Sequence, residues 1–326
     1  MMSINDLYAE INMPPALKSR FDDDGNETDQ VLPRHEQVPA WKVQDFAWYP
    51  DNWAIDGPNS VAYFVVAKPG CGMWIDFNAN NANARYVAVR LSIQGLDPIT
   101  GQKANHLRME QYRHLCPIHG TPFTGERFCP LCGYRWPPQN YLTSAGNARG
   151  DFWLDGFMAE PGVIRQYIFT EDVMRGMAAQ IIGEARTYSI GIAFYLSKAV
   201  KPTPQRVTRG SPYSKSSGLE ELLGSAAVKY SFDSPAKGIV DEPLLLRGVT
   251  GGNRPARKKI EIAAGARIRQ RVEVDPLNVL TDWDPVPAGI IMVNYTDQDT
   301  ADQVIRSGRV NSGRNEGFMK ARVVGN

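Results

Sequence analysis

A five-residue phrase of the form Cys-Pro-x-(Cys or His)-Gly occurs twice in the middle of this chain, at residues 116–120 and 129–133. The first and fourth positions of such a phrase can hold one metal ion together, and the glycine that follows permits a turn with positive φ. The two phrases supply four ligands, which are Cys116, His119, Cys129 and Cys132. Their spacing predicts a short zinc-ribbon hairpin over residues 114–137.

Thiolate and imidazole donors suit zinc, because a d10 ion imposes no geometry that competes with the one the protein offers. Three sulfurs and one nitrogen fill a tetrahedral shell and leave no position for an activated water. We therefore expect one structural zinc per chain, with Tyr134 and Trp136 packed over it. Iron is the alternative metal, and the histidine ligand argues against it. His114 is expected at the surface rather than as a fifth ligand.

Composition places the chain among ordinary globular proteins, because 43% of its 326 residues are hydrophobic and 22% are charged. No stretch approaches the roughly 20 consecutive apolar residues of a membrane-spanning helix, and the N-terminus is polar. Three of the four cysteines lie within one short window, which fits a metal site in a reducing compartment. These features predict a cytoplasmic protein with no membrane partner. Cys71 is left over and is expected to be a small buried or half-buried residue.

Strands dominate the hydrophobic pattern. Residues 85–94 alternate apolar and polar side chains with the period of a half-buried strand. The runs at 61–67 and 72–77 read as a hairpin across Pro69-Gly70, and a helix is expected at 299–306. Further strands are predicted at 152–159, 163–169, 188–196, 244–246, 259–264, 267–274 and 289–295. A short helix is predicted at 3–11. The pattern at 170–182 is ambiguous between helix and other structure. The expected class is mostly β (β-rich α+β), a β-sandwich or sheet-based modules carrying the zinc hairpin.

Four regions follow from this pattern. Residues 1–40 read as an N-terminal arm that packs against a neighbouring copy, and 41–198 as a β-rich domain containing the zinc hairpin. Residues 199–218 are rich in Pro, Ser and Gly and read as a linker or long loop. Residues 219–326 read as a second β-rich module with a C-terminal helix.

Charge is unevenly distributed although the chain as a whole carries only +1. Residues 1–60 are strongly acidic, and residues 201–275 are basic. Opposite charges on one chain favour contacts within or between copies. The densest basic cluster is Arg254, Arg257, Lys258 and Lys259. It reads either as a contact for a polyanion or another partner, or as a solvated edge strand protected by its charge.

Catalytic motifs are sparse. There is no P-loop and no Gly-x-Gly-x-x-Gly that opens a helix. The remaining histidines, His35, His106 and His114, lie in polar stretches without a nucleophile nearby. Asp151, Asp155 and Asp172 could act as paired carboxylates, but acidic residues are common at strand ends. No catalytic residue is therefore assigned, and the sequence leans against an enzyme.

Four phrases later in the chain carry a resemblance: Trp153-Leu154-Asp155-Gly156, residues 162–167 (GVIRQY), 179–184 (AQIIGE) and 262–270 (IAAGARIRQ), with Asp275 and Trp283 beyond them. This set resembles the signature of a family of uncharacterised microbial and fungal proteins, here with a short zinc-ribbon-like insertion. The resemblance implies a shared β-rich module and no particular reaction. The chain departs from that pattern by about sixty additional residues from 199 onward.

Three functions remain open from the sequence. The preferred one is a non-enzymatic structural protein that associates with copies of itself through its arm and loops into a homo-oligomer or larger assembly. The alternative is a zinc-ribbon adaptor or nucleic-acid-binding protein that uses the basic cluster. The third is an enzyme whose site leaves no local motif.

Overall fold

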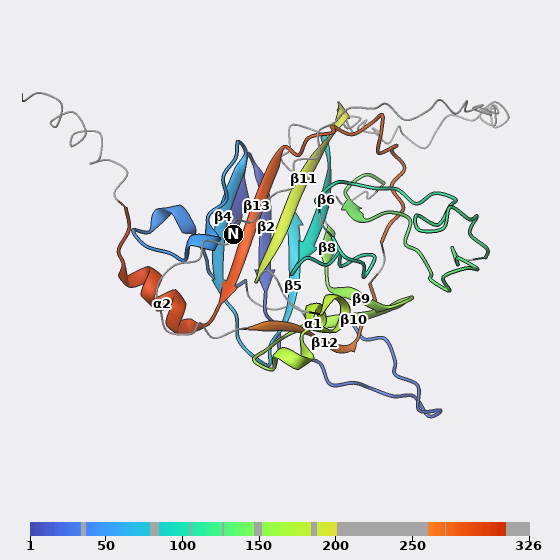
Figure 1. Ribbon diagram of the computed structural model, residues 1–326, viewed down its shortest axis with the longest axis horizontal. Coiled ribbons are helices and arrows are strands. Elements are labelled where there is room, and N and C mark those ends of the chain that lie inside the picture. The colour runs from blue at the N-terminus through green and yellow to red at the C-terminus, as the bar shows by residue number, and fades with distance from the viewer. Residues whose placement is uncertain are drawn as a thin grey trace, which may run out of the picture. The chain divides into compact units, whose positions relative to one another are not determined.

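The computed structural model describes residues 1–33, 37–78, 85–104, 106–125, 127–146, 152–183, 188–200, 260–270 and 272–310. Contacts divide the chain into two units, Met1–Lys201 with Leu246–Asn326, and Pro202–Leu245. All of the described residues belong to the first unit. They form a mostly β structure built on two multi-stranded sheets, which confirms the predicted class (Figure 1).

The larger sheet has seven strands in the order β1-β2-β5-β10-β12, with β8 beside β5 and β9 beside β10. Its strands are β1 (Met2–Ile4), β2 (Leu7–Asn12), β5 (Gly72–Asn78), β8 (Phe152–Leu154), β9 (Gly156–Glu160), β10 (Val163–Thr170) and β12 (Glu261–Arg267). Neighbouring strands in it run antiparallel.

The second sheet has six strands in the order β3-β4-β13-β11-β6-β7. They are β3 (Ala40–Lys42), β4 (Ser60–Val66), β6 (Arg85–Ile93), β7 (Tyr141–Thr143), β11 (Ser189–Val200) and β13 (Gly289–Thr296). The pair β4 and β13 is parallel, and the other neighbours are antiparallel.

One hydrophobic core lies between the two sheets. Phe77 of β5 meets Phe194 of β11 with ring centroids 6.3 Å apart, and Phe169 of β10 meets Tyr295 of β13 at 5.4 Å. Aromatic pairs at these separations contribute beyond the area that they bury. Because the pairs join strands of different sheets, the sheets pack face to face as a sandwich.

Strand β6 is buried on both faces, although its alternation predicted a half-buried strand. Val89 and Leu91 face the main core, while Arg90 on the opposite face is 2% exposed. A second cluster, which includes Met109 and Trp283, covers this opposite face. Chain segments distant in sequence supply this cover, which the local period of two could not indicate.

Helices are few among the described residues: the 3-10 turns η1 (Val43–Asp45), η2 (Asp51–Trp53) and η3 (Val173–Arg175), and the α-helices α1 (Met177–Ile182) and α2 (Gln298–Arg306). Helix α2 matches its prediction, because the Asp297 carboxylate accepts a hydrogen bond from the Thr300 amide at 2.9 Å. Gly176 separates η3 from α1, which explains the ambiguous pattern at 170–182. None of these helices has the length and apolar composition needed to cross a bilayer.

The helix predicted at residues 3–11 is wrong, because this segment forms a β-hairpin. Asn5 and Asp6 have φ of 48° and 61°, and β1 and β2 pair around them from Ile4 and Leu7 outward. A two-residue turn with both φ positive is the form that matches the twist of paired strands. The side chains of Leu7, Ala9 and Ile11 then all enter the main core.

The hairpin predicted from 61–67 and 72–77 is also wrong, although both strands exist. Strand β4 pairs with β3 and β13, and β5 pairs with β2, β8 and β10 in the other sheet. The chain therefore crosses between the sheets around Pro69. Adjacent apolar runs joined by a turn do not reveal whether they pair or part.

Strands from the last third of the chain belong to the same two sheets as the earlier strands. β12 pairs with β10, and β13 pairs with β11 and β4. The strand expected at 259–264 appears as β12, which ends at Arg267. The strand expected at 267–274 is wrong, because the described residues 268–270 and 272–274 lie outside the named strands. The second module expected at 219–326 thus contributes strands to both sheets. The linker expected at 199–218 and the strand expected at 244–246 lie outside the described residues, apart from 199 and 200 in β11.

Residues 13–33 of the predicted arm are held by their own chain. The Arg165 guanidinium lies 3.0 Å from the Glu27 carboxylate, and Arg267 pairs with Asp29 at 2.5 Å. The Ser19 hydroxyl donates to Glu27 at 2.6 Å, and this bond, with the Arg267 amide and Arg165, lowers the pKa of Glu27 against the opposing effect of burial. A neighbouring copy is therefore not needed to order this part of the chain.

Candidate metal centre

The four predicted ligands come together. Their donor atoms all lie within 4.8 Å of one another. His119 Nδ1 is 3.6 Å from Cys116 Sγ and 3.7 Å from Cys129 Sγ, and Cys116 Sγ is 3.9 Å from Cys132 Sγ. A tetrahedral ion with bonds of about 2.3 Å to sulfur and 2.0 Å to nitrogen holds its donors roughly 3.5–3.8 Å apart. The cage thus fits one metal ion bound through three sulfurs and Nδ1.

Two turns with the same hydrogen bonds build the cage. In the first, the Cys116 amide donates to the Thr121 carbonyl and the Gly120 amide donates back to the Cys116 carbonyl, both at 2.8 Å. In the second, Cys129 and Tyr134 are joined at 2.9 Å, and Gly133 donates to Cys129 at 2.9 Å. Gly120 and Gly133 have φ of 63° and 65°, a conformation that glycine adopts at lower cost than other residues. The repeated phrase in the sequence is therefore a repeated structure.

The turns sit in the connection between β6 and β7, which are paired neighbours in the second sheet. Two paired segments, called here the stem, lead out to the turns. In the stem, the Asn140 amide donates to the Glu110 carbonyl at 3.1 Å, and the Tyr112 amide donates to the Pro138 carbonyl at 2.8 Å. Residues 112–136, called here the metal module, follow this stem. The module lies among the teal to green loops of Figure 1. An insertion between paired strands leaves the sheet itself intact.

A small core of its own supports the metal module. Tyr112 and Trp136 are buried beside Cys116 and Cys129, and Tyr134 packs against this cluster. The rings of Trp136 and Tyr134 are 5.1 Å apart, so both residues lie at the site as predicted. The Tyr134 hydroxyl also donates to the Thr100 carbonyl, which ties the module to the turn after β6.

Hydrogen bonds prepare one thiol for metal binding. Burial raises the pKa of Cys129, but bonds from the Thr121 hydroxyl (3.4 Å) and the Cys132 and Leu131 amides outweigh it and lower the pKa to about 5. Burial raises the pKa of Cys132, and the neighbouring Cys129 adds to this effect. The indole N–H of Trp136 has no oxygen or nitrogen acceptor, and its interaction with the Cys132 sulfur favours the thiolate. Because a metal binds the thiolate form, these donors favour loading.

Arg127 braces the base of the module and was not foreseen. Its guanidinium donates to the carbonyls of Trp136 (2.9 Å), Arg113 (3.2 Å) and Pro137 (3.0 Å), and also to that of Tyr112. Burial lowers its pKa. Its φ of 63° places it in the left-handed region, where an arginine is uncommon. The side chain thereby ties both strands of the stem together.

A buried network of polar side chains connects the stem to the sandwich. Gln139 donates to the Glu273 carbonyl at 2.8 Å, and Gln111 donates to the Leu277 carbonyl at 2.6 Å. The Asp275 carboxylate accepts hydrogen bonds from the Tyr141 hydroxyl (2.6 Å) and the Trp283 indole (2.9 Å). Burial raises the pKa of Asp275 against these bonds. Gln111 and Gln139 gave no signal in the sequence, whereas Asp275 and Trp283 belong to the set of residues that carries the resemblance.

Where the structure describes them, the other candidate residues do not assemble into a site. His114 is exposed, and His106 lies 3.8 Å from Glu110. Asp155 accepts a bond from Trp153 at 2.9 Å, whereas Asp172 caps η3. Cys71 is half-buried against the main core, which agrees with its prediction. His35, Asp151 and the basic cluster of Arg254, Arg257, Lys258 and Lys259 lie outside the described residues.

Three of the four phrases that carry the resemblance, at residues 153–156, 162–167 and 262–270, contact one another. The Gln270 side chain accepts bonds from the Asp155 and Gly156 amides, both at 2.8 Å. A Cβ on Gly156 would lie 2.3 Å from the Arg165 carbonyl oxygen, so only glycine fits there. Gln166 accepts a bond from the Leu17 amide at 2.9 Å. These residues join β8, β9, β10 and the end of β12, which is a packing role.

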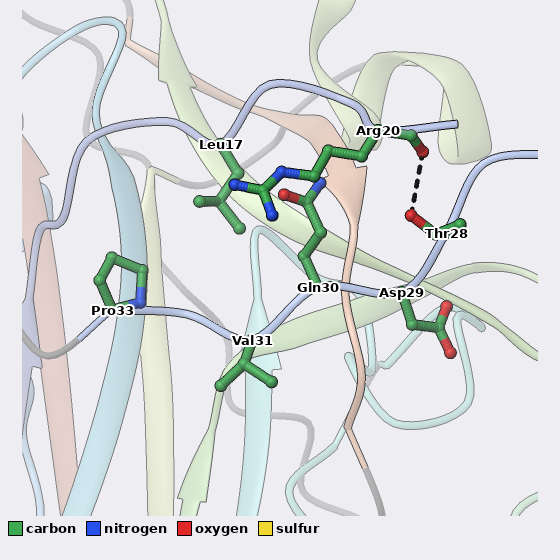
Figure 2. A pocket seen from close by; sticks show the side chains of 7 residues that line it. All are labelled: Leu17, Arg20, Thr28, Asp29, Gln30, Val31 and Pro33. Carbon is green, nitrogen blue, oxygen red and sulfur yellow. Dashed lines mark hydrogen bonds between the residues drawn. The ribbon is translucent and has the colours of Figure 1, made fainter. Parts of the chain in front are cut away.

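A hollow of about 410 Å³ lies within the arm, lined by Leu17, Arg20, Thr28, Asp29, Gln30, Val31 and Pro33 (Figure 2). Gln30 donates to the Lys18 carbonyl at 2.9 Å, and Asp29 is paired with Arg267. The Arg20 side chain points back toward Leu17. Most of the polar groups in its wall already serve to hold the arm.

No family model matches this sequence, and comparisons with curated proteins and with solved structures give no match either.

Proposed function

We propose that the protein is a non-enzymatic structural protein that binds one zinc ion and associates with copies of itself. The observation that carries the proposal is the cage of Cys116, His119, Cys129 and Cys132. Four donors complete the usual shell of zinc, whereas catalytic zinc keeps one position for water or substrate. A filled shell stabilises the fold around it and leaves the surface of the module to meet other molecules.

Self-association is supported by what the module exposes. Leu115, Ile118, Phe128 and Leu131 have 45% to 64% of their surface exposed, all within the metal module. Exposed apolar side chains concentrated in one short segment are typical of an interaction surface. In this proposal, zinc fixes the conformation of the metal module in which these four side chains are exposed.

Zinc analysis beside light scattering tests this function. We expect one zinc per chain and an oligomer at micromolar concentration that dissociates when a chelator removes the metal. A protein that is monomeric with zinc bound would contradict self-association, and a protein without zinc would contradict the metal assignment.

A nucleic-acid-binding or adaptor role is the second candidate, favoured by the arginines of the module. Arg113 and Arg135 are both exposed. Clustered arginines release counterions when they bind phosphates, so such binding would weaken steeply with salt. A gel-shift assay with single- and double-stranded nucleic acids at low salt decides it, and no shift would end this candidate.

A further inference from the structure

The exposed apolar residues of the metal module repeat with its two turns. Leu115 and Phe128 each precede the first cysteine of a turn, and they are 52% and 45% exposed. Ile118 and Leu131 each occupy the third position, and they are 61% and 64% exposed. The small core of the module uses other residues. These four side chains are therefore exposed at positions adjacent in sequence to the ligands and lie outside the small core.

The charge of the module indicates what could cover them. The sequence of residues 112–136 contains three arginines and one glutamate. Bound zinc would offset two of the three thiolate charges, which leaves the module slightly positive. Two modules facing each other would then place like charges together, which costs affinity. An acidic partner with an apolar residue is favoured.

The arm of this chain has that chemistry at its tip, defined as residues 20–28. Phe21 is 64% exposed, and Asp22, Asp23 and Asp24 beside it are exposed. The tip is already ordered, because Thr28 donates to the Arg20 carbonyl at 2.8 Å and Asp22 accepts bonds from the Asp24 and Asn26 amides. A preorganised loop binds without an ordering cost.

We infer that the metal module of one copy binds the arm tip of a second copy, with Phe21 among the exposed apolar side chains and the aspartates facing Arg113 and Arg135. The inference rests on the proposed self-association and specifies its contact. Such a contact joins two different surfaces, so it is heterologous and produces a ring or an open chain of copies. An isologous contact, in which the module binds the module, would stop at a dimer.

Two variants separate these cases: Phe21→Asp, which disables the arm tip, and Leu131→Asp, which disables the module. Met174→Asp and Leu280→Asp are matched controls, because these residues are 80% and 84% exposed at other places. Zinc content and circular dichroism verify that each variant is folded. If Leu131→Asp lost its zinc, Ile118→Asp at the equivalent position of the other turn would replace it.

Sedimentation velocity on the full chain gives the decisive comparison. The controls should assemble like the unaltered protein, and each disabling variant should be monomeric, with its dissociation constant raised about tenfold or more. An equimolar mixture of the two variants should form a 1:1 dimer, because one intact module meets one intact arm tip. A mixture that stays monomeric, or a Phe21→Asp variant that assembles normally, would overturn the contact while leaving self-association standing. A monomeric unaltered protein would instead overturn the proposed function.

Discussion

Cys129 and Cys132 differ in their surroundings although both belong to the same turn. Cys129 is fully buried and its thiolate is favoured by three hydrogen-bond donors, whereas Cys132 is exposed and its pKa is raised. At the scale of single residues, Cys129 thus contributes both a ligand and part of the small core. Its loss should affect the module more than the loss of a half-buried cysteine elsewhere.

Cys129→Ser should lose the metal and unfold residues 115–136, because metal binding supplies much of the folding free energy of small zinc modules. Elemental analysis and amide hydrogen exchange would measure both effects. Cys71→Ser is the matched control and should keep its metal and its protection. Full metal content and unchanged stability in Cys129→Ser would show that the ligand assignment is wrong.

Arg127→Lys should destabilise the metal module by about 1–3 kcal/mol, because a lysine cannot donate to four carbonyls from one planar group. Competition with a chelator would show faster loss of metal. Arg113→Lys is the control, since Arg113 is exposed and its bonds to Gln111 and Leu277 are longer, at 3.2 and 3.4 Å. Equal rates of metal loss in the two variants would contradict a bracing role for Arg127.

Asp155 makes stability depend on pH. Burial raises its pKa to about 6, with a further contribution from the charge of Asp76 and against the bond from Trp153. A carboxyl whose pKa is raised in the folded state stabilises the protein below its unfolded pKa, and this stability is lost as pH rises through the folded value. The free energy of unfolding of the unaltered protein should therefore fall by roughly 1–3 kcal/mol between about pH 4 and 6, and Asp155→Asn should abolish this fall. Melting temperatures across this range would measure it, with exposed Asp56→Asn as the control; identical profiles for Asp155→Asn and the unaltered protein would contradict it.

The ligand set could be predicted from the sequence because each turn is local: two ligands three positions apart and one glycine specify it. Arg127 could not be predicted in this way. Its four acceptors lie on both strands of the stem, and its positive φ leaves no mark on the residue type. The same holds for Asp155, whose raised pKa comes from tertiary burial.

At the scale of elements, local patterns predicted strands well and their partners poorly. The alternation in β6 and the apolar runs of β4 and β5 fixed where strands occur, but pairing depends on long-range contacts. The hairpin of β1 and β2 gives little local signal, because Asn5-Asp6 lacks the glycine that usually marks a turn with two positive φ values. The stem of the metal module was likewise invisible, since its anchors Gln111 and Gln139 bond to a distant loop.

Gln139→Ala should loosen the stem, because it removes a hydrogen bond to the Glu273 carbonyl and one from the amide of the buried Asp275. An unsatisfied buried group costs about 1–3 kcal/mol. Hydrogen exchange in residues 109–112 and 138–140 should accelerate. Gln298→Ala, which removes an exposed bond to Asp302, is the control and should change little. Unaltered exchange in the stem would mean that the loop does not anchor it.

At the scale of the whole molecule, the metal module and the sandwich have separate cores. Removing the metal should therefore melt the module and abolish self-association while β6, β11 and β13 keep their protection. Hydrogen exchange and sedimentation of the chelated protein would test this together. Loss of protection throughout the sandwich would show that the metal supports the entire fold.

X-ray absorption at the zinc edge tests the central claim most directly, because it counts the atoms bound to the metal. The account predicts three sulfur atoms at about 2.3 Å and one nitrogen atom at about 2.0 Å, with no water oxygen. An oxygen donor in the shell, or fewer than three sulfurs, would contradict a closed structural centre at Cys116, His119, Cys129 and Cys132.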